Sequence, residues 1–394
     1  MTAPAPLVVT TAPARSLDSA PASAWPLLWP PLRMAMHAID AERAHGAAVS
    51  VLSVLGANVA GRALLRMFAG GQVADPVTVM GLRFPNRVGL AAGWDKDARA
   101  WPALCCLGFG HVEVGTITPR PQAGNAKPRV FRLTEDAALI NRMGFPGQGA
   151  AAAARRLQRQ PAPGARPGGA IVGVNLGRNA TTENVDAAAD AIAVLELVAA
   201  HADYVALNVS SPNTSGLRAL QHGEALAALV AAVAARRDAL VASGATGGRA
   251  LPLAVKIAPD LDAAQLDAAV DAVLAGGAQA IVATNTTLSR DDGHGAALRA
   301  AAAAEAGGLS GRPLEARARA VLGHVARRAD GRLALIAAGG IASADDARVR
   351  VELGADLVQV YTGLVYRGPG LIAEAGLGAQ RGFAGRDAVR GAAS

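Results

Sequence analysis

The feature that most constrains the fold is a repeated alternation, beginning after Asp75-Pro76, of short apolar runs with longer alanine-rich stretches. Each run is an almost continuous series of Val, Ile, Leu and Ala, which is typical of parallel strands covered on both faces. The alanine-rich stretches between them predict helices, and hence a series of βα units. The eight runs are Arg87–Gly93, His111–Ile117, Ala170–Gly177, Tyr204–Ser211, Leu251–Ala258, Ala280–Thr286, Leu333–Gly340 and Leu357–Gly363.

Polar side chains gather at the end of nearly every run. They are Asp95-Lys96, Thr116, Asn175, Asn208–Ser211, Lys256, Asn285-Thr286, Gly339-Gly340 and Tyr361-Thr362. In a closed barrel these ends meet at one rim, where barrel enzymes build their sites. An open doubly wound sheet would give similar strands but would not bring all eight ends together. The sequence therefore predicts an α/β fold, a (β/α)8 TIM barrel with its site at the carboxyl-terminal rim.

The chain before the barrel predicts a small N-terminal helical subdomain. Pro30-Pro31 is expected to open a first amphipathic helix, and Asp40 to cap a second one. An apolar stripe on the second helix is formed by Ala44, Ala47, Ala48, Val51, Leu55 and Val59. Either these helices pack on the barrel, or they dip into a bilayer surface. The predicted boundaries are 1–25 for a disordered extension, 26–72 for the helices, 73–382 for the barrel and 383–394 for a C-terminal tail.

Composition narrows the possible partners. The net charge is +7, but the arginines are scattered singly, so we expect attraction to anionic lipid headgroups and no nucleic-acid partner. No uncharged apolar stretch reaches the roughly 18 residues of a membrane span. Cys105 and Cys106 are adjacent and diverge on a helix, so neither a disulfide nor a metal site is expected, and a reducing compartment fits.

Two features at the predicted rim suit an anionic ligand. Gly339-Gly340, together with Gly311, can form a phosphate cradle, although a double glycine alone is more often a plain turn. Lys256 ends an apolar strand, so its stem is expected inside the barrel and its ammonium at the rim. A buried lysine needs an anionic partner, which is either a structural ion pair or a reduced flavin. For Lys96, which carboxylates flank, structural and functional roles are balanced.

Amide side chains are expected at the same rim, where their paired donors and acceptors suit a planar amide-and-carboxylate ligand. They are Asn141, Asn208, Asn213 and Asn285. Ser211 lies among them, either as a turn residue before Pro212 or as a base. A serine needs desolvation and a relay to lose its proton, and Thr214 is close enough in sequence to be that relay. The motif contains no histidine, which argues against a Ser-His-Asp hydrolase.

Six motifs occur in an order that resembles one family. They are Gly89–Lys96, Gly115–Pro121, Ile140–Phe145, Asn208–Thr214, Ala283–Thr287 and Gly308–Pro313. Together they resemble the class 2 dihydroorotate dehydrogenases, which are membrane-associated and reduce quinone, and the likeness runs from about residue 31 to 370. Class 1 relatives look different, because they carry a cysteine as base and lack the N-terminal helices.

The resemblance implies the cofactor FMN and oxidation of dihydroorotate to orotate in pyrimidine (UMP) biosynthesis. Ser211 would take the C5 proton while hydride leaves C6 for the flavin, with Thr214 and Lys96 also catalytic. The implied FMN contacts are Ala92, Gly93, Trp94, Asp95, Lys96, Thr116, Asn175, Asn208, Lys256, Thr284, Gly311, Gly340, Tyr361 and Thr362. The implied substrate contacts are Lys96, Asn141, Arg142, Met143, Gly144, Phe145, Asn208, Asn213, Asn285 and Thr286.

The resemblance also implies that a membrane quinone reoxidises the flavin. The N-terminal helices would form a tunnel to a quinone site at His45, Arg132 and Tyr361. The protein is expected to be a monomer, bound peripherally on the cytoplasmic side of a bacterial inner membrane. One departure follows Phe145, where Pro146-Gly147 replace the usual asparagine and remove a side chain near the substrate.

Other functions stay open on the sequence. A related FMN barrel could oxidise another cyclic amide and pass electrons to a soluble acceptor, such as fumarate or NAD. A phosphate-binding barrel without catalysis, or a scaffold at the membrane surface, would bind no flavin. Bound colour and the choice of oxidant separate these possibilities.

Overall fold

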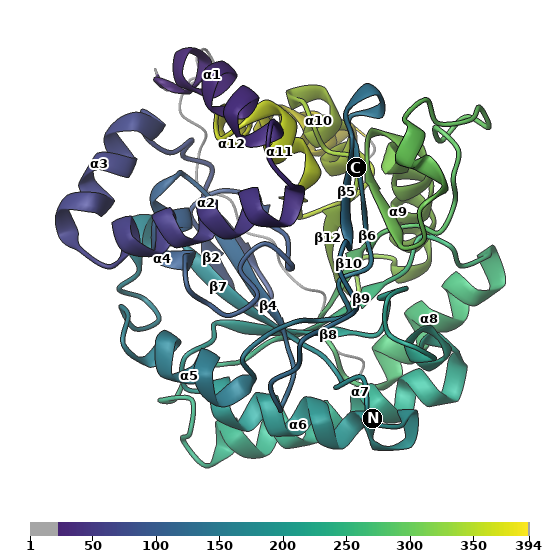
Figure 1. Ribbon diagram of the computed structural model, residues 1–394. Helices are drawn as coiled ribbons and strands as arrows, with labels where there is room; N and C mark the ends of the chain where they lie inside the picture. The colour runs from purple at the N-terminus through teal and green to yellow at the C-terminus, as the bar shows by residue number, and fades with distance from the viewer. Residues whose placement is uncertain (1–22, 393–394) are drawn as a thin grey trace.

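The computed structural model describes residues 23–392. The predicted extension 1–25 therefore lies, up to residue 22, outside the described part. Eight parallel strands close into a barrel, which confirms the predicted (β/α)8 fold (Figure 1). In spatial order they are β3 (Val88–Leu90), β4 (His111–Ile117), β7 (Ile171–Leu176), β8 (Tyr204–Asn208), β9 (Leu253–Ile257), β10 (Ala280–Ala283), β12 (Ala334–Ala338) and β13 (Leu357–Val360).

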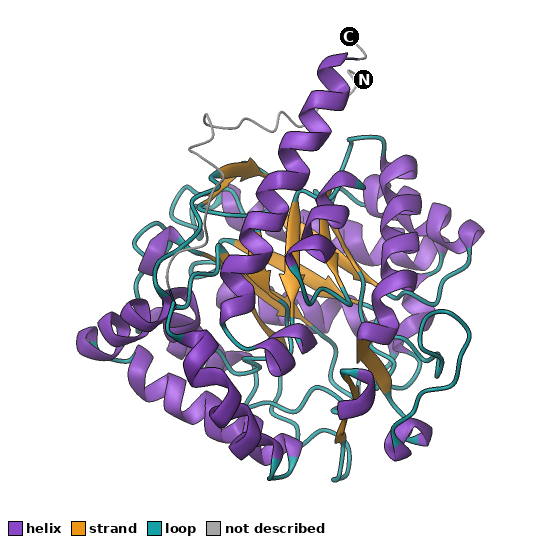
Figure 2. Cartoon of the chain, turned by 90° about the horizontal axis from the view of Figure 1, so that it is seen from above, coloured by secondary structure: helices purple, strands orange, loops and turns teal. Residues whose placement is uncertain are grey.

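Helices surround the barrel (Figure 1). They are α4 (Trp101–Cys106), α5 (Ala150–Gln158), α6 (Ala187–Val198), α7 (Gly223–Ala242), α8 (Ala263–Ala275), α9 (Glu315–Ala329), α10 (Ala344–Glu352), α11 (Thr362–Arg367) and α12 (Gly370–Ala392). Figure 2 shows α12 as the long helix that leads toward the C-terminus, and it continues through the boundary expected after residue 382. Short 3-10 helices lie in the connections, namely η1 (Thr134–Asp136), η2 (Pro167–Gly169), η3 (Asn184–Asp186), η4 (Leu217–Gln221), η5 (Ala301–Ala304) and η6 (Arg312–Leu314).

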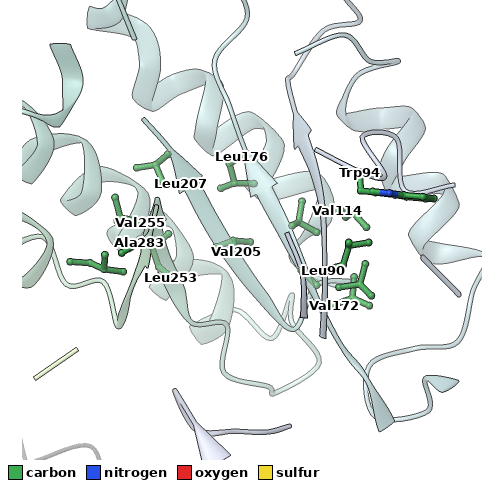
Figure 3. Close-up of a cluster of buried hydrophobic side chains, with 14 of the residues drawn as sticks. Leu90, Trp94, Val114, Val172, Leu176, Val205, Leu207, Leu253, Val255 and Ala283 are labelled. Carbon is green, nitrogen blue, oxygen red and sulfur yellow. The ribbon is translucent and has the colours of Figure 1, made fainter. Parts of the chain in front are cut away.

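Alternate residues of each strand point to opposite faces, and the outward set builds the main core. Leu90, Val114, Val205 and Val255 belong to one buried cluster that also contains apolar side chains of the surrounding helices (Figure 3). Burying each such side chain contributes about 1.5–3 kcal/mol. The near-continuous apolar runs of the sequence follow from this, since the outward face packs on helices and the inward face fills the barrel.

Inside the barrel, glycines make room for large neighbours. A Cβ added at Gly89 would lie 2.0 Å from Nε2 of His111, and one added at Gly173 would lie 2.1 Å from Cζ of Tyr204. A hairpin of β1 (Val77–Val79) and β2 (Leu82–Phe84) packs against the same interior cluster. The amino-terminal end of the barrel is therefore filled with side chains, and the functional groups lie at the carboxyl-terminal ends of the strands, at the opposite rim.

A three-stranded sheet, which the sequence did not predict, lies in the strand-to-helix connections. It joins β5 (Val130–Leu133), β6 (Ala138–Asn141) and β11 (Gly308–Gly311) in antiparallel pairs. Tyr366 of α11 donates its hydroxyl to the carbonyl of Ala138 at 2.7 Å. These four-residue strands are too short to stand out by periodicity, and they bring Asn141 to the rim.

The N-terminal helices differ from the prediction at two boundaries. Helix α1 (Trp25–His37) begins before Pro30-Pro31 and contains both prolines, which was not expected because each removes one helical hydrogen bond. The indole of Trp29 donates to the carbonyl of Tyr366 at 3.1 Å and anchors the helix on the barrel domain. The second helix ends at Gly56, so Val59 does not extend its apolar stripe and instead begins a third helix.

Side-chain caps explain where these helices start. Asp40 caps α2 (Ala41–Gly56), as predicted, by accepting from the N–H of Arg43. Asn58 caps α3 (Val59–Ala69) by accepting from the N–H of Gly61 at 2.7 Å. Among residues 23–392 no single helix is long and apolar enough to cross a membrane; α2 and α3 together meet that test by length and composition, with a bend of 114° between them.

Ion pairs and hydrogen bonds fasten α2 to the barrel domain. Glu42 accepts from Nη2 of Arg129 at 2.8 Å, and the guanidinium of Arg129 is almost completely buried. Arg132 of β5 donates to the carbonyls of Ile39 at 2.7 Å and Met36 at 3.0 Å, which fixes the turn between α1 and α2. The helices therefore form one body with the rim rather than a loose extension.

Candidate active site

A cavity of about 660 Å³ extends from the N-terminal helices to the carboxyl-terminal rim of the barrel. Its outer part is apolar, with lining residues that include Leu32, Met36, Ala48, Val51, Leu52 and Leu55. Its inner part is polar, with lining residues that include Lys96, Asn141, Asn208, Ser211, Asn213, Lys256 and Asn285. One space therefore joins a polar chamber to an apolar passage.

The loop after β8 presents Ser211 to this cavity. The side chain of Ser211 is buried, and its Oγ accepts from the N–H of Asn213 at 3.2 Å. Thr214 is buried nearby, and its hydroxyl has no hydrogen-bond partner among the described residues. No hydrogen bond joins the two hydroxyls directly, so a proton relay between them would need a bridging water.

Amides from three strand ends surround the serine. The amide nitrogen of Asn213 donates to Oδ1 of Asn141 at 3.2 Å, and that of Asn285 donates to Oγ of Ser210 at 2.9 Å. Asn285 also lies 3.3 Å from Oδ1 of Asn208. The four asparagines singled out in the sequence are thus brought together, with their orientations set by one another.

A buried polar layer supports the chamber from inside the barrel. The carboxylate of Glu113 accepts from Asn175 at 2.8 Å, Tyr204 at 3.0 Å and Gln359 at 3.0 Å. Lys256 is buried on a nearby strand and lines the cavity. Burial lowers the pKa of Lys256, while the negative charge of Glu113 acts against that change. A cationic group with one counter-charge beneath it suits an anionic ligand above it.

Lys96 and His45 lie where the polar chamber meets the apolar passage. Lys96 donates to the carbonyl of Gly93 at 2.5 Å; burial lowers its pKa to about 8, and the charge of Glu42 on α2 opposes this. The ring of His45 packs edge-on against Trp94 with centroids 5.0 Å apart. Burial, and then the charge of Lys96, lowers the pKa of His45 to about 3. At neutral pH this imidazole is therefore uncharged.

Backbone donors are available at the seventh and eighth strand ends. The N–H groups of Gly340, Thr362 and Gly363 donate to no other described residue. Gly340 has φ +75°, and an added Cβ would lie 2.3 Å from Cα of Glu315. Only glycine fits there, so the chain can turn its amides toward a bound anion.

Comparisons with known proteins agree with this geometry. A sequence model of the family "Dihydroorotate dehydrogenase" matches residues 76–375. The chain belongs to the dihydroorotate dehydrogenase family. A protein of Methylibium petroleiphilum named "Dihydroorotate dehydrogenase (quinone)" is 45% identical, covering 86% of this chain and 94% of its own. One of Leptothrix cholodnii with the same name is 49% identical, covering 78% and 87%.

A solved structure supports the fold as well. The crystal structure of dihydroorotate dehydrogenase from Eimeria tenella in complex with ferulenol has a TM-score of 0.71 and 36% sequence identity. The match covers 80% of this chain and 85% of that one. The chain is therefore similar to these relatives over most of its length.

Most of the residues that the family resemblance singled out line the cavity. They are His45, Ala92, Gly93, Trp94, Lys96, Thr116, Arg132, Asn141, Met143, Gly144, Phe145, Asn208, Ser211, Asn213, Lys256, Thr284, Asn285, Thr286, Gly311, Gly340, Tyr361 and Thr362. Their roles toward cofactor, substrate and quinone stay predictions.

Four other residues that the family resemblance singled out do not line the cavity. Thr214 is a buried residue of the serine loop itself, and Asn175 belongs to the buried polar layer around Glu113. The carboxylate of Asp95 instead accepts from backbone N–H groups at the start of α4, those of residues 99, 100 and 101. Arg142 pairs with Glu305 at 2.6 Å. A contact of Asp95 or Arg142 to a ligand would thus come from its backbone.

The segment that departs from the dehydrogenase pattern is held in place by Gln122. The amide nitrogen of Gln122 donates to the carbonyls of Gly144 at 3.0 Å and Phe145 at 3.1 Å. Its backbone also exchanges two hydrogen bonds of 3.0 Å with Gly147. Phe145 adopts φ +52°, which a non-glycine residue rarely does and which aims its side chain at the cavity. Pro146-Gly147 thus belong to a loop that hydrogen bonds from Gln122 hold in place.

Sequence reasoning missed several polar residues of this dehydrogenase site. Glu113 had a usable signal, because it is a lone carboxylate in the wholly buried strand β4. Gln359 is similar in β13. Arg218 and Asp260, which join the rim loops, had no such signal, since charged residues in connections are usually solvated.

Proposed function

We propose that this chain is a quinone-dependent dihydroorotate dehydrogenase that oxidises dihydroorotate to orotate in pyrimidine biosynthesis. The observation that carries the proposal is the single cavity, polar at the serine loop and apolar between the N-terminal helices. A soluble substrate and a lipid-soluble oxidant need these two environments in one space. The two relatives named "Dihydroorotate dehydrogenase (quinone)" agree with this pairing.

FMN is the proposed cofactor, and the residues present fit it. The free N–H groups of Gly340, Thr362 and Gly363 suit a phosphate group. Lys256, whose amine has no hydrogen-bond partner among residues 23–392, suits an electron-rich ring. When bound, FMN supplies the hydride acceptor for dihydroorotate and passes the electrons to the quinone.

Ser211 is the proposed base. Its hydroxyl faces the cavity, is shielded from bulk water, and accepts one hydrogen bond. Shielding removes bulk water from the hydroxyl, and one bridging water would carry the proton toward Thr214, with which Ser211 shares no direct hydrogen bond. The four asparagines and the ammonium of Lys96 match a ligand with ring amides and a carboxylate, as dihydroorotate has.

The apolar passage is the proposed quinone path, with His45, Arg132 and Tyr361 beside it. Large apolar side chains on the three N-terminal helices are exposed, among them Leu27, Met34, Val54, Val59 and Met67. Such a patch is typical of a surface that meets a membrane. Peripheral binding to the inner face of a bacterial membrane is part of the proposal.

Anaerobic titration tests the function. The purified protein should be yellow, lose its flavin absorbance when dihydroorotate is added without oxygen, and regain it with a short-chain ubiquinone. A yellow preparation that does not bleach with dihydroorotate rejects the substrate assignment. A preparation that neither carries nor binds flavin rejects the redox function and favours a non-catalytic barrel.

The second candidate, a related barrel with a soluble acceptor, is separated by the oxidant. The bleached protein should be reoxidised by ubiquinone much faster than by equal concentrations of fumarate or NAD. The apolar lining of the passage is the reason for this expectation, because it offers few partners for a dicarboxylate or a dinucleotide. If fumarate or NAD reoxidised the protein faster, that soluble compound would take the place of the quinone as the proposed electron acceptor.

A further inference from the structure

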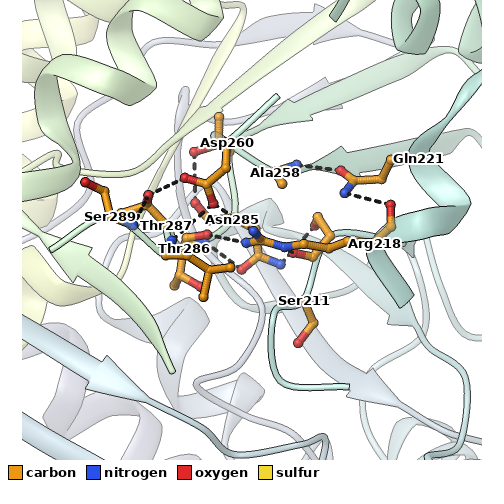
Figure 4. A network of polar contacts seen from close by, with 12 residues as sticks. Ser211, Arg218, Gln221, Ala258, Asp260, Asn285, Thr286, Thr287 and Ser289 are labelled. Carbon is orange, nitrogen blue, oxygen red and sulfur yellow. Dashed lines mark hydrogen bonds and ion pairs between the residues drawn. The ribbon is translucent and has the colours of Figure 1, made fainter. Parts of the chain in front are cut away.

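One arginine joins three neighbouring strand ends behind the proposed base (Figure 4). Arg218 lies in η4 (Leu217–Gln221), immediately after the serine loop. Its Nε donates to the carbonyl of Ser210 at 3.0 Å, and its Nη2 donates to the carbonyl of Thr286 at 2.8 Å. Its Nη1 donates to Oδ2 of Asp260 at 2.7 Å. The loops after β8, β9 and β10 therefore share one guanidinium.

Asp260 fixes the arginine from the far side. Besides Arg218, its carboxylate accepts from the hydroxyl of Thr287 and from the N–H of Leu288 at 3.1 Å. Gln221, at the other end of η4, accepts from the N–H of Ala258 at 2.7 Å. The short helix is thus tied to the end of β9 at both of its ends and has little freedom to shift.

We call Arg218 together with its acceptors Ser210, Asp260 and Thr286 the clamp. These groups are largely buried, which indicates that the clamp fixes the positions of the loops and is not an ordinary surface ion pair. Ser210 is fully buried, while the side chains of Arg218 and Asp260 are 20% and 22% exposed. The planar guanidinium meets three acceptors at fixed angles, which the single ammonium of a lysine cannot do. The two ends of the serine loop are held by different arginines. Arg218 donates to the carbonyl of Ser210 at its start, and Arg178 donates to the carbonyl of Ser215 at its end.

We propose that Arg218, held by Asp260, is the positioning residue that sets Ser211 against the Asn285-Thr286 side of the cavity. This inference rests on the proposed function. Arg218 does not line the cavity and acts only through the carbonyls of Ser210 and Thr286. Proton removal by Ser211 requires its hydroxyl to face a substrate held by the neighbouring strand end, so the distance between the two ends decides the rate.

The variant Arg218→Gln tests the clamp. Flavin bleaching by saturating dihydroorotate, measured anaerobically in a stopped-flow instrument, should slow by about 100-fold, the typical effect of a displacement near 1 Å. Reoxidation by ubiquinone should be unchanged. In a Ser211→Ala background, Arg218→Gln should cause no further slowing, because residues that act as a unit are not additive. Equal slowing in both backgrounds, or none in either, overturns the proposal.

Further variants distinguish positioning from general stability. Arg218→Lys keeps the charge and the pair with Asp260, and it should recover only part of the rate; full recovery would mean that charge alone matters. Asp260→Asn should slow bleaching less than Arg218→Gln. The matched control is Arg236→Gln, which removes an arginine from an exposed pair with Glu196 and should leave bleaching unchanged.

A readout without substrate completes the test. Backbone amides of residues 209, 210, 211, 213 and 214 should exchange hydrogen faster in Arg218→Gln than in the wild type, whereas those of helix α7, which follows η4, should not. Unchanged exchange in residues 209–214 contradicts the clamp even if the rate falls. If wild-type protein does not bleach with dihydroorotate, the proposed function fails, and the exchange experiment still decides whether Arg218 holds the loop.

Discussion

Ser211 adds one hydroxyl to the cavity and contributes little to the stability of its loop. Its single hydrogen bond, from the N–H of Asn213, is long, whereas the loop is held by arginine and amide side chains. Ser211→Ala should therefore retain FMN and bind orotate with similar affinity. It should slow flavin bleaching by about 100- to 10,000-fold, the range for loss of a general base. Anaerobic stopped-flow absorbance measures the rate.

A neighbouring serine provides the control for this prediction. Ser215 is exposed in the same loop, and the loop uses only its carbonyl. Ser215→Ala should leave bleaching unchanged, and Ser211→Cys should retain part of the rate. If Ser211→Ala bleaches as fast as Ser215→Ala, another group removes the proton.

Gly340 is the residue at which a single methyl group should displace the cofactor. An alanine there would collide with the backbone at the start of α9, 2.3 Å away, in addition to the strain of φ +75°. We expect Gly340→Ala to raise the dissociation constant of FMN by at least about tenfold, equal to roughly 1.4 kcal/mol. Fluorescence of free flavin after dialysis and back-titration measures the binding.

Gly331→Ala is the control that separates the steric collision expected at Gly340 from the backbone strain of a positive φ. Gly331 has a similar φ of +70°, but an added Cβ would meet nothing within 4 Å. Gly331→Ala should lower the free energy of unfolding by about 1 kcal/mol through left-handed strain alone and leave FMN bound. Equal FMN affinity in the two variants would show that the backbone donors near Gly340 do not hold the cofactor.

At the scale of elements, the N-terminal helices carry exposed apolar side chains that the barrel does not use. Val54 of α2 and Met67 of α3 are 68% and 66% exposed. A double variant, Val54→Glu with Met67→Glu, should weaken binding to anionic vesicles and slow ubiquinone turnover on them. Bleaching by dihydroorotate should persist, because neither residue lines the cavity. Vesicle co-sedimentation and steady-state turnover measure the two effects.

Two substitutions on the barrel surface are the control for this patch. Leu197→Glu with Val185→Glu introduces the same charge at exposed apolar residues of the α6 region, away from the N-terminal helices. This protein should still bind vesicles. Equal loss of vesicle binding in both double variants would remove the helices as the membrane-facing surface.

Elements were predictable where one physical signal dominated. The eight barrel strands have both faces buried, so their apolar runs are continuous and easily read. Asp40 was readable as a cap because its side chain acts on the next turn alone. By contrast, α1 passes through Pro30 and Pro31 because of tertiary anchors such as Trp29, and such contacts leave no local pattern.

The site was predictable to a similar degree and for a similar reason. Residues at strand ends, such as Lys256 and Ser211, could be placed because the fold brings all strand ends to one rim. The orientation of a long side chain depends on partners elsewhere in the chain. Arg142 pairs with Glu305, and Arg218 with Asp260, across gaps of 163 and 42 residues. No local sequence pattern specifies those pairs.

At the scale of the whole molecule, filling a barrel with polar groups makes its stability depend on pH. His111 is fully buried among the inward side chains, and burial lowers its pKa to about 3 from an ordinary value of 6.5. Between these values the unfolded chain binds a proton that the folded protein does not. The stability that this group contributes is therefore present above pH 6.5 and is lost as the pH falls toward 3.

The expected loss of stability follows from the pH range between the two pKa values of His111. Between pH 6.5 and 5, His111 should reduce the free energy of unfolding by roughly 2 kcal/mol, at about 1.4 kcal/mol for each pH unit. His111→Gln should remove that part of the acid sensitivity, even if it lowers stability at pH 7, whereas His294→Gln in an exposed loop should not. Comparing urea unfolding at pH 7 and pH 5 in each protein cancels the contribution of carboxylates that all three share. The same acid sensitivity in His111→Gln as in the wild type would mean that the barrel interior admits a charged imidazole, and that its polar layer is hydrated rather than closed.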